Sequence, residues 1–154
     1  MKCRMNIESD SFKLGDIIVA HRFLYRHYGV YLGNGRVIHY AAKKGDFGAD
    51  AKVHETSLGK FANGSKCEAI SSTENPKGAK PFSRQETVSR TRSRIGEGRY
   101  NLLFNNCEHF ALWCRYGTNK SVQVEKAFAA AMVLGTAIVA AKLIKSGNNE
   151  RANK

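Results

Sequence analysis

The sequence predicts an α+β domain, in which a small antiparallel sheet has helices packed on it and an apolar helix follows near the C-terminus. Three patterns lead to this prediction. A strand-like segment turns back on itself between 27 and 40, a helical segment begins at Cys107, and the run 127–141 is apolar and uncharged. A chain of 154 residues is long enough to bury a core as a single domain.

A β-hairpin is the first predicted element. Residues 27–32 are rich in β-branched and aromatic side chains, Gly33-Asn34-Gly35 is typical of a tight turn, and residues 36–40 form the returning strand. Strand alternation allows His27 and His39 to share a face, although they lie near opposite ends of the paired segment. With a further strand near 53–56, we expect a sheet from about Asp16 to Thr56.

The second predicted element is a helix that begins at Cys107. Asn105 and Asn106 are natural N-cap residues, and Gly117 is suited to end the helix. The unpaired N–H groups and the positive end of a helix dipole favour an anion, so we expect the pKa of Cys107 to lie below its ordinary value of about 8.5. The alternative is that Cys107 is a small buried apolar residue, which is a common role for free cysteine.

A cysteine nucleophile needs a base, and two of the five histidines suit the role by their context. His27 and His39 lie on the predicted hairpin and fit the pattern of a base and a residue that orients it. His21 and His54 have polar neighbours and are expected at the surface. His109 lies about 200° around the helix from Cys107, so we expect it to act in packing.

These features do not predict a metal or cofactor site. Cys107, His109 and Cys114 could be imagined as zinc ligands, but three such positions on one helix do not converge on a point. The chain has no CxxC pair. We therefore expect neither a metal nor a cofactor.

The two motifs together resemble the lecithin:retinol acyltransferase-like family. The first motif is the pair His27 and His39, which lie 12 positions apart and follow Gly15-Asp16. The second is the later pentapeptide Asn106-Cys107-Glu108-His109-Phe110. This family includes the H-box and NC-motif phospholipase/acyltransferases and is related to the NlpC/P60 hydrolases by circular permutation. The resemblance extends from about Phe12 to Ile144. Members often carry Trp after the first histidine, where this chain has Tyr28.

The resemblance implies a fold, three site residues and a reaction. The fold would be a permuted papain-like NlpC/P60 architecture, with a catalytic domain at 12–118, an apolar helix at 119–146 and a polar tail at 147–154. Cys107 would be the nucleophile, His27 the general base and His39 the orienting residue. The enzyme would transfer an acyl group from a glycerophospholipid through a thioester, as a phospholipase A or acyltransferase. The alternatives are a cysteine peptidase or amidase of the NlpC/P60 type and a non-catalytic membrane-binding module.

The formal net charge of +12 points to an anionic partner. Ser83-Arg84-Gln85-Glu86 has the capping-box pattern, which predicts a basic helix from about Arg84 to Ile95. Aromatic residues do not alternate with these charges and no nucleic-acid motif accompanies them, so we expect no nucleic acid. A membrane surface with anionic lipid is the expected partner beside the phospholipid substrate.

The apolar run 127–141 has two interpretations. Its fifteen residues would span about 22 Å as a helix, less than the roughly 30 Å of a bilayer core. Lys126 and Lys142 bracket the run and could reach the lipid headgroups. We expect this helix to associate with a membrane, and the alternative is a helix buried in the protein core.

The cysteines and the N-terminus favour a cytoplasmic location. Cys3, Cys67, Cys107 and Cys114 show no disulfide framework, which favours a reducing compartment. The first six residues contain no apolar segment typical of a secretory signal. We therefore expect a cytoplasmic protein that the C-terminal helix can bring to membranes.

Overall fold

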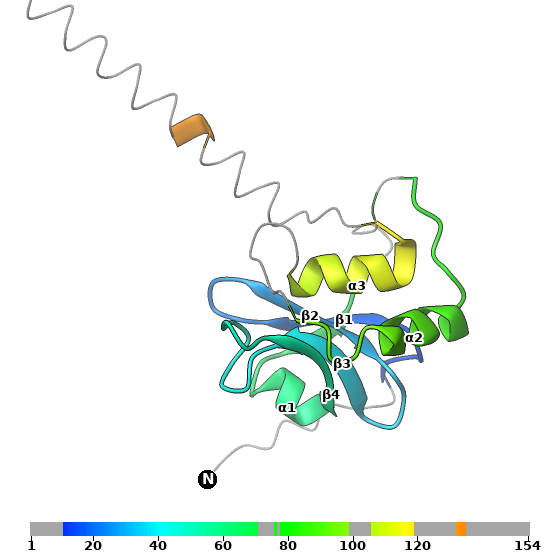
Figure 1. The fold of residues 1–154 in the computed structure, drawn as a ribbon, viewed down its shortest axis with the longest axis horizontal. Helices are drawn as coiled ribbons and strands as arrows, with labels where there is room; N and C mark the ends of the chain where they lie inside the picture. Colours follow the sequence, from blue (N-terminus) through cyan, green and yellow to red (C-terminus); the bar gives the residue numbers. More distant parts are fainter. Residues whose placement is uncertain (1–10, 71–75, 77, 99–105, 119–131, 135–154) are drawn as a thin grey trace, which may run out of the picture. The chain divides into compact units, whose positions relative to one another are not determined.

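The structure is a computed structural model that describes residues 11–70, 76, 78–98, 106–118 and 132–134 (Figure 1). The chain divides into two compact units, Met1–Lys120 and Ser121–Lys154. The first unit contains the sheet, the helices and every predicted site residue.

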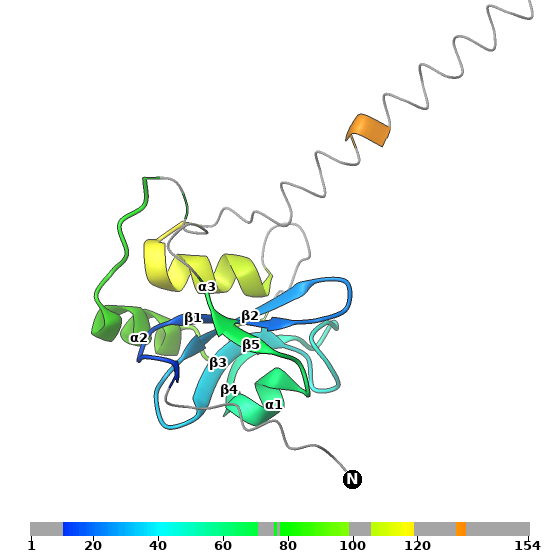
Figure 2. The ribbon, with the colours of Figure 1, turned by 180° about the vertical axis from the view of Figure 1, so that it is seen from behind.

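The first unit is built on a five-stranded antiparallel sheet with the strand order β4-β3-β2-β1-β5 (Figures 1 and 2). The strands are β1 (Ile17–His21), β2 (Arg26–Tyr31), β3 (Arg36–Ala41), β4 (Lys52–Ser57) and β5 (Cys67–Ala69). This confirms the predicted sheet and its hairpin. The predicted limit at Thr56 was wrong, because β5 pairs with the free edge of β1. A strand of three residues is too short to show alternation in the sequence.

Three helices accompany the sheet: α1 (Leu58–Ala62), α2 (Arg84–Ser93) and α3 (Cys107–Tyr116). Both longer helices begin as predicted. The Ser83 hydroxyl caps α2 by accepting from Glu86 N–H, and Asn106 caps α3. Helix α3 ends at Gly117, whose φ of 70° is left-handed and suits glycine. Figure 1 shows α3 on one face of the sheet and α1 on the other.

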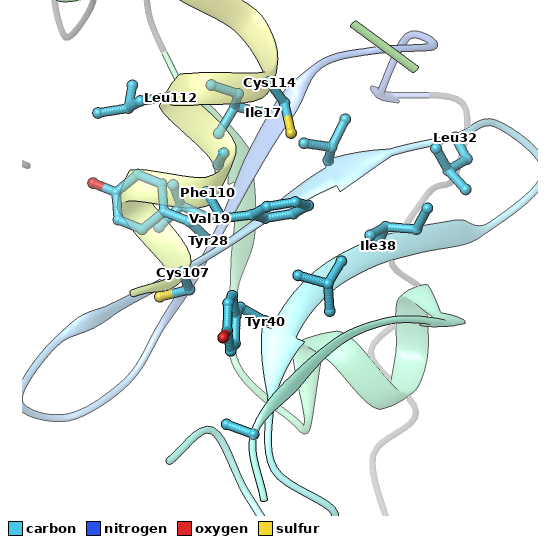
Figure 3. Close-up of a cluster of buried hydrophobic side chains, with 14 of the residues drawn as sticks. Ile17, Val19, Tyr28, Leu32, Ile38, Tyr40, Cys107, Phe110, Leu112 and Cys114 are labelled. Carbon is cyan, nitrogen blue, oxygen red and sulfur yellow. The ribbon is translucent and has the colours of Figure 1, made fainter. Parts of the chain in front are cut away.

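The two faces of the sheet bury two separate clusters. On the α3 face, alternate residues of β1, β2 and β3 meet Phe110, Leu112 and Cys114 of α3 (Figure 3). On the α1 face, a smaller cluster surrounds Phe61. The first cluster includes Ile17, Val19, Tyr28, Val30, Ile38, Tyr40 and Cys107; the second includes Phe12, Ile18, Ala20, Tyr31, Val37, Leu58 and Phe61. Adjacent strand residues therefore serve opposite sides of the molecule.

Most of the predicted C-terminal helix, 119–146, lies outside the described residues. Met132, Val133 and Leu134 are helical, and their exposed fractions are 57%, 67% and 65%. Among the residues that the structure describes, no helix is both long and apolar enough to cross a membrane. The predicted domain boundaries and polar tail remain predictions.

Candidate active site

The local structure at the start of α3 fixes the position of Cys107. Asn106 Oδ1 accepts hydrogen bonds from the N–H groups of Glu108 and His109, both at 3.0 Å. In return, Asn106 N–H donates to His109 Nδ1 at 3.4 Å, which completes a capping box. His109 is buried in this cap, in agreement with the packing role predicted for it.

Cys107 is a buried thiol. Its side chain joins the apolar cluster between α3 and the sheet, close to Tyr28 (Figure 3). Burial raises its pKa to about 12, although backbone hydrogen bonds from Tyr28 and Glu108 favour the thiolate. The predicted low pKa was therefore wrong, because the loss of solvation outweighs the helix terminus. In this state Cys107 is a neutral thiol.

The structure brings His27 and His39 together on the α1 face. Gly29 pairs with His39 across β2 and β3, and His27, two residues before Gly29, lies on the same face. His27 Nε2 lies 2.8 Å from His39 Nδ1, and both rings contact Phe61. The shared face predicted from alternation is confirmed. Burial lowers the pKa of both imidazoles, so both rings are neutral near pH 7.

The Cys107 sulfur contacts β2 just beyond the point where its described ladder with β3 ends. Leu32 N–H donates to Arg36 O at 2.8 Å, toward β3. Along a strand, every second N–H points the same way, so the N–H of Tyr28, four residues earlier, also points toward β3. The described ladder ends at Gly29↔His39, and Tyr28 N–H instead donates to the Cys107 sulfur. The thiol therefore sits beside the residue that follows His27 in β2.

Neither histidine ring is hydrogen-bonded to Cys107 within the described part of the chain. His27 Nε2 is occupied by His39, whereas His27 Nδ1 is buried and has no hydrogen-bond partner there. A buried imidazole nitrogen without a partner is uncommon and calls for a physical explanation. Of the two ring nitrogens of His27, Nδ1 is therefore the one that remains available to accept a proton.

His54 was predicted at the surface, and this was wrong. It lies opposite His39 in the register of β3 and β4, and its Nε2 is 3.1 Å from His39 Nε2. Its Nδ1 lies 3.0 Å from the Lys52 carbonyl oxygen. The polar sequence around His54 reflects the exposed edge of β4, while its own ring is half-buried against His39. Only the strand register reveals this contact.

Asp46 also escaped the sequence analysis. Its carboxylate lies 3.4 Å from His27 Nε2 and is held by Arg22 Nε at 2.7 Å and by the Tyr25 hydroxyl at 2.6 Å. Burial alone would raise the pKa of Asp46, but these hydrogen bonds and the neighbouring His27 lower it, so Asp46 is a carboxylate. It belongs to the loop between β3 and β4, where side-chain positions follow no periodic pattern.

Two other described thiols and His21 form no hydrogen bond or ion pair with the histidine rings or Asp46 in the part of the chain that the structure describes. Cys67 and Cys114 are free thiols like Cys107. His21 is exposed and pairs with Glu68 at 2.6 Å, which confirms its predicted surface position. In the described ranges, no three His, Cys, Asp or Glu side chains are arranged to hold a metal ion.

Comparison with known proteins gives the family of this chain. The family model described as lecithin retinol acyltransferase matches residues 10–120. Human lecithin retinol acyltransferase is 31% identical over 141 residues, which cover 77% of this chain and 61% of that protein. The bovine protein is 30% identical with the same coverage. Human phospholipase A and acyltransferase 3 is 32% identical over 144 residues, covering 86% of this chain and 88% of that protein. The chain belongs to the lecithin retinol acyltransferase family.

Proposed function

We propose that this protein is an enzyme that transfers an acyl group from a glycerophospholipid through a thioester on Cys107. The relatives are named as acyltransferases and phospholipases, and the chain spans 61% of the length of the lecithin retinol acyltransferases. The observation that carries the proposal is the buried, unpartnered His27 Nδ1 in the residue next to Tyr28, whose N–H donates to the Cys107 sulfur, with His27 Nε2 held by His39. Nucleophile, base and orienting residue are then all present.

The reaction would start from neutral groups. As Cys107 Sγ attacks the ester carbonyl carbon, His27 Nδ1 takes the thiol proton, so no thiolate accumulates beforehand. The imidazolium that forms on His27 is stabilised by Asp46, whose carboxylate is 3.4 Å from its Nε2. His27 then returns the proton to the leaving lysophospholipid oxygen, and the acyl group remains on sulfur as a thioester.

A second half-reaction would release the acyl group. Water as acceptor gives phospholipase activity, and an alcohol or amine gives acyl transfer. His27 removes the acceptor proton and returns it to the departing sulfur. The oxyanion would be met at the start of α3. Because Asn106 already accepts from the Glu108 and His109 N–H groups, the Cys107 N–H is our candidate donor.

The membrane partner and the finer architecture are further proposals. We infer a cytoplasmic enzyme that works at an anionic membrane surface, with residues 119–146 contributing a membrane-associating helix and the catalytic unit a permuted NlpC/P60 arrangement. Met132, Val133 and Leu134 support the helix, because they are helical and expose apolar side chains. Liposome flotation of the full chain and of a chain ending at Ser121 tests this role, and equal flotation of both would reject it.

The basic helix α2 is a weaker candidate for binding lipid. Arg84 pairs with Asp16 at 2.6 Å, and Arg94 pairs with Glu97 at 2.8 Å. The Arg90 guanidinium lies 3.9 Å from the ring centre of Trp113. Two arginines of α2 and the Arg94 at its C-cap therefore bind within the protein, so a surface that binds anionic lipid must be sought elsewhere as well.

One experiment tests the acyl-transfer proposal. Purified full-length protein is incubated with phosphatidylcholine labelled in one acyl chain, and the protein is trapped in acid and analysed by mass spectrometry. We expect an acyl adduct on Cys107 that hydroxylamine removes, together with labelled fatty acid or acyl product. Cleavage of peptide or amide substrates without any lipid adduct would favour the NlpC/P60-like alternative. Vesicle binding without either reaction would favour the non-catalytic module.

A further inference from the structure

The turn between β1 and β2 exposes two large apolar side chains at its tip. Arg22 N–H donates to Tyr25 O at 2.9 Å, which closes the turn and leaves Phe23 and Leu24 at its end. Their exposed fractions are 99% and 85%, the highest among the large hydrophobic residues that the structure describes. Exposed apolar groups that gather on one surface commonly mark a binding site.

This turn is held firmly by the protein beneath it. The Arg22 guanidinium donates to the Asp46 carboxylate, to the carbonyl oxygens of Phe61 and Ala62 at 2.9 and 2.6 Å, and to Ser65 Oγ at 2.9 Å. These bonds connect the turn to α1 and to the loop after β3. Phe23 and Leu24 are therefore presented by an ordered base.

The loop between β3 and β4, which contacts this turn, carries further apolar and basic groups. The ring of Phe47, which is 44% exposed, lies 4.6 Å from the ring of Tyr25. Lys43 and Lys44 precede it in this loop, and both are exposed. We define the interfacial patch as Phe23, Leu24, Phe47, Lys43 and Lys44.

The patch adjoins the candidate active site through Asp46. This carboxylate binds Arg22 and Tyr25 of the turn and lies 3.4 Å from His27 Nε2. Apolar side chains that enter the acyl region, flanked by lysines at headgroup level, match the chemistry of an anionic phospholipid surface. We propose that the interfacial patch inserts into the phospholipid surface and brings an ester group to His27 and Cys107. The choice of phospholipid rests on the proposed function.

Vesicle binding without turnover tests the patch. The full-length Cys107→Ser protein is sedimented with vesicles of phosphatidylcholine and phosphatidylserine, alone and with Phe23→Ser plus Leu24→Ser. We expect the paired change to weaken partitioning at least tenfold, which corresponds to about 1.4 kcal/mol. Ile95→Ser is the matched control, because Ile95 is 51% exposed two residues after α2 ends, and it should leave binding unchanged.

Two further measurements separate this proposal from the proposed function. Lys43→Gln with Lys44→Gln should remove most of the gain that phosphatidylserine gives over pure phosphatidylcholine vesicles. In the active enzyme, Phe23→Ser with Leu24→Ser should slow turnover of vesicle lipid at least tenfold and leave turnover of a dispersed short-chain phosphatidylcholine unchanged. A protein that binds vesicles through the patch but turns over no lipid would overturn the proposed function alone.

Three outcomes would overturn the patch. The first is vesicle binding at the wild-type level by the Phe23→Ser, Leu24→Ser protein. The second is an equal loss of vesicle binding in the Ile95→Ser control. The third is that the Cys107→Ser protein with an unaltered patch does not bind vesicles at all. Conversion of a dimer to a monomer by the paired change, with vesicle binding intact, would identify a second copy of the chain as the occupant instead.

A second inference follows from the three histidine rings. The Lys52 carbonyl can only accept, so His54 Nδ1 must carry the hydrogen that joins them. With this tautomer, His54 accepts at Nε2 from His39 Nε2–H, and His39 accepts at Nδ1 from His27 Nε2–H. The Asp46 carboxylate, 3.4 Å from His27 Nε2, can only accept a hydrogen bond, so it also favours a hydrogen on His27 Nε2. The lone pair of His27 is thus left on Nδ1.

We infer that His54 is a positioning residue, which fixes the tautomers of His39 and His27 so that His27 Nδ1 can act as the base. Replacing His54 by Phe removes the acceptor, so His39 can adopt the opposite tautomer and draw His27 with it. His54→Gln keeps an acceptor oxygen and should restore much of the activity. We expect kcat to fall about tenfold in the first variant and about threefold or less in the second.

Nitrogen NMR provides a readout that a purely structural role would not move. With ¹⁵N-labelled histidine, His27 Nδ1 should give the shift of an unprotonated nitrogen in the wild type and a mixed shift in His54→Phe. Thermal unfolding confirms that each variant is folded. An unchanged His27 signal in folded His54→Phe, or equal kcat in both variants and the wild type, would overturn the inference.

Discussion

The two faces of the sheet use the same strands but differ in chemistry. On the α3 face, β2 and β3 present apolar side chains, namely Tyr28, Val30, Ile38 and Tyr40. On the α1 face, the intervening positions present His27, Gly29 and His39. The apolar face holds Cys107 as a protonated thiol, and the histidine face holds a neutral base. The proposed reaction therefore needs groups from both faces, the thiol from one and the imidazole from the other.

Removing the proposed nucleophile should have the largest effect. Cys107→Ser is nearly isosteric, so the apolar face should stay intact while acyl transfer falls at least about a thousandfold. Turnover of labelled phosphatidylcholine and the thermal unfolding midpoint are measured together. Turnover close to that of the wild type would exclude Cys107 as the nucleophile.

The two histidines should differ in importance. His27→Gln removes the base and should reduce kcat by about a hundredfold or more. His39→Gln retains an oxygen that can accept from His27 Nε2–H and should cost about tenfold less than His27→Gln. Kinetics of both variants under identical conditions decide the order. If His39→Gln were the more damaging change, the roles of the two residues would have to be exchanged.

The sequence determined the hairpin and both longer helices because their signals are local. The Gly33-Asn34-Gly35 turn sets the register of β2 and β3, and the Asn106 cap marks the start of α3. His54 and Asp46 could not be predicted, since their contacts depend on the position of β4 and of an irregular loop. The thiol pKa was misjudged for a related reason: a helix terminus is visible in sequence, whereas the depth of burial is not.

Acid should destabilise the histidine face. Burial lowers the pKa of His27 and His39 below the ordinary 6.5, so the unfolded chain binds protons that the folded protein does not. This stability is fully present above pH 6.5 and is lost as the pH falls below it. Denaturant unfolding should show that the free energy of unfolding decreases as the pH is lowered from 7 to 5. The slope should be smaller in His39→Gln by up to about 1.4 kcal/mol per pH unit. Identical slopes in the two proteins would contradict this account.

The smallest effect should come from the one position on the histidine face that must lack a side chain. A Cβ on Gly29 would lie 2.7 Å from Val37 Cγ1 and 2.8 Å from Phe61 Cε2, so α1 or β3 would have to move. We expect Gly29→Ala to destabilise the fold by about 1–3 kcal/mol through overpacking. Gly59→Ala is the matched control, since a Cβ there meets nothing within 4 Å and alanine favours the helix α1. Thermal and denaturant unfolding of both variants measure the difference. Gly29 lies opposite His39 and two residues from His27 on this face, and both rings contact Phe61, so a shift of Phe61 should also slow turnover. Equal stability and turnover in the two variants would mean that the histidine face can repack freely, unlike the close-packed core against α3.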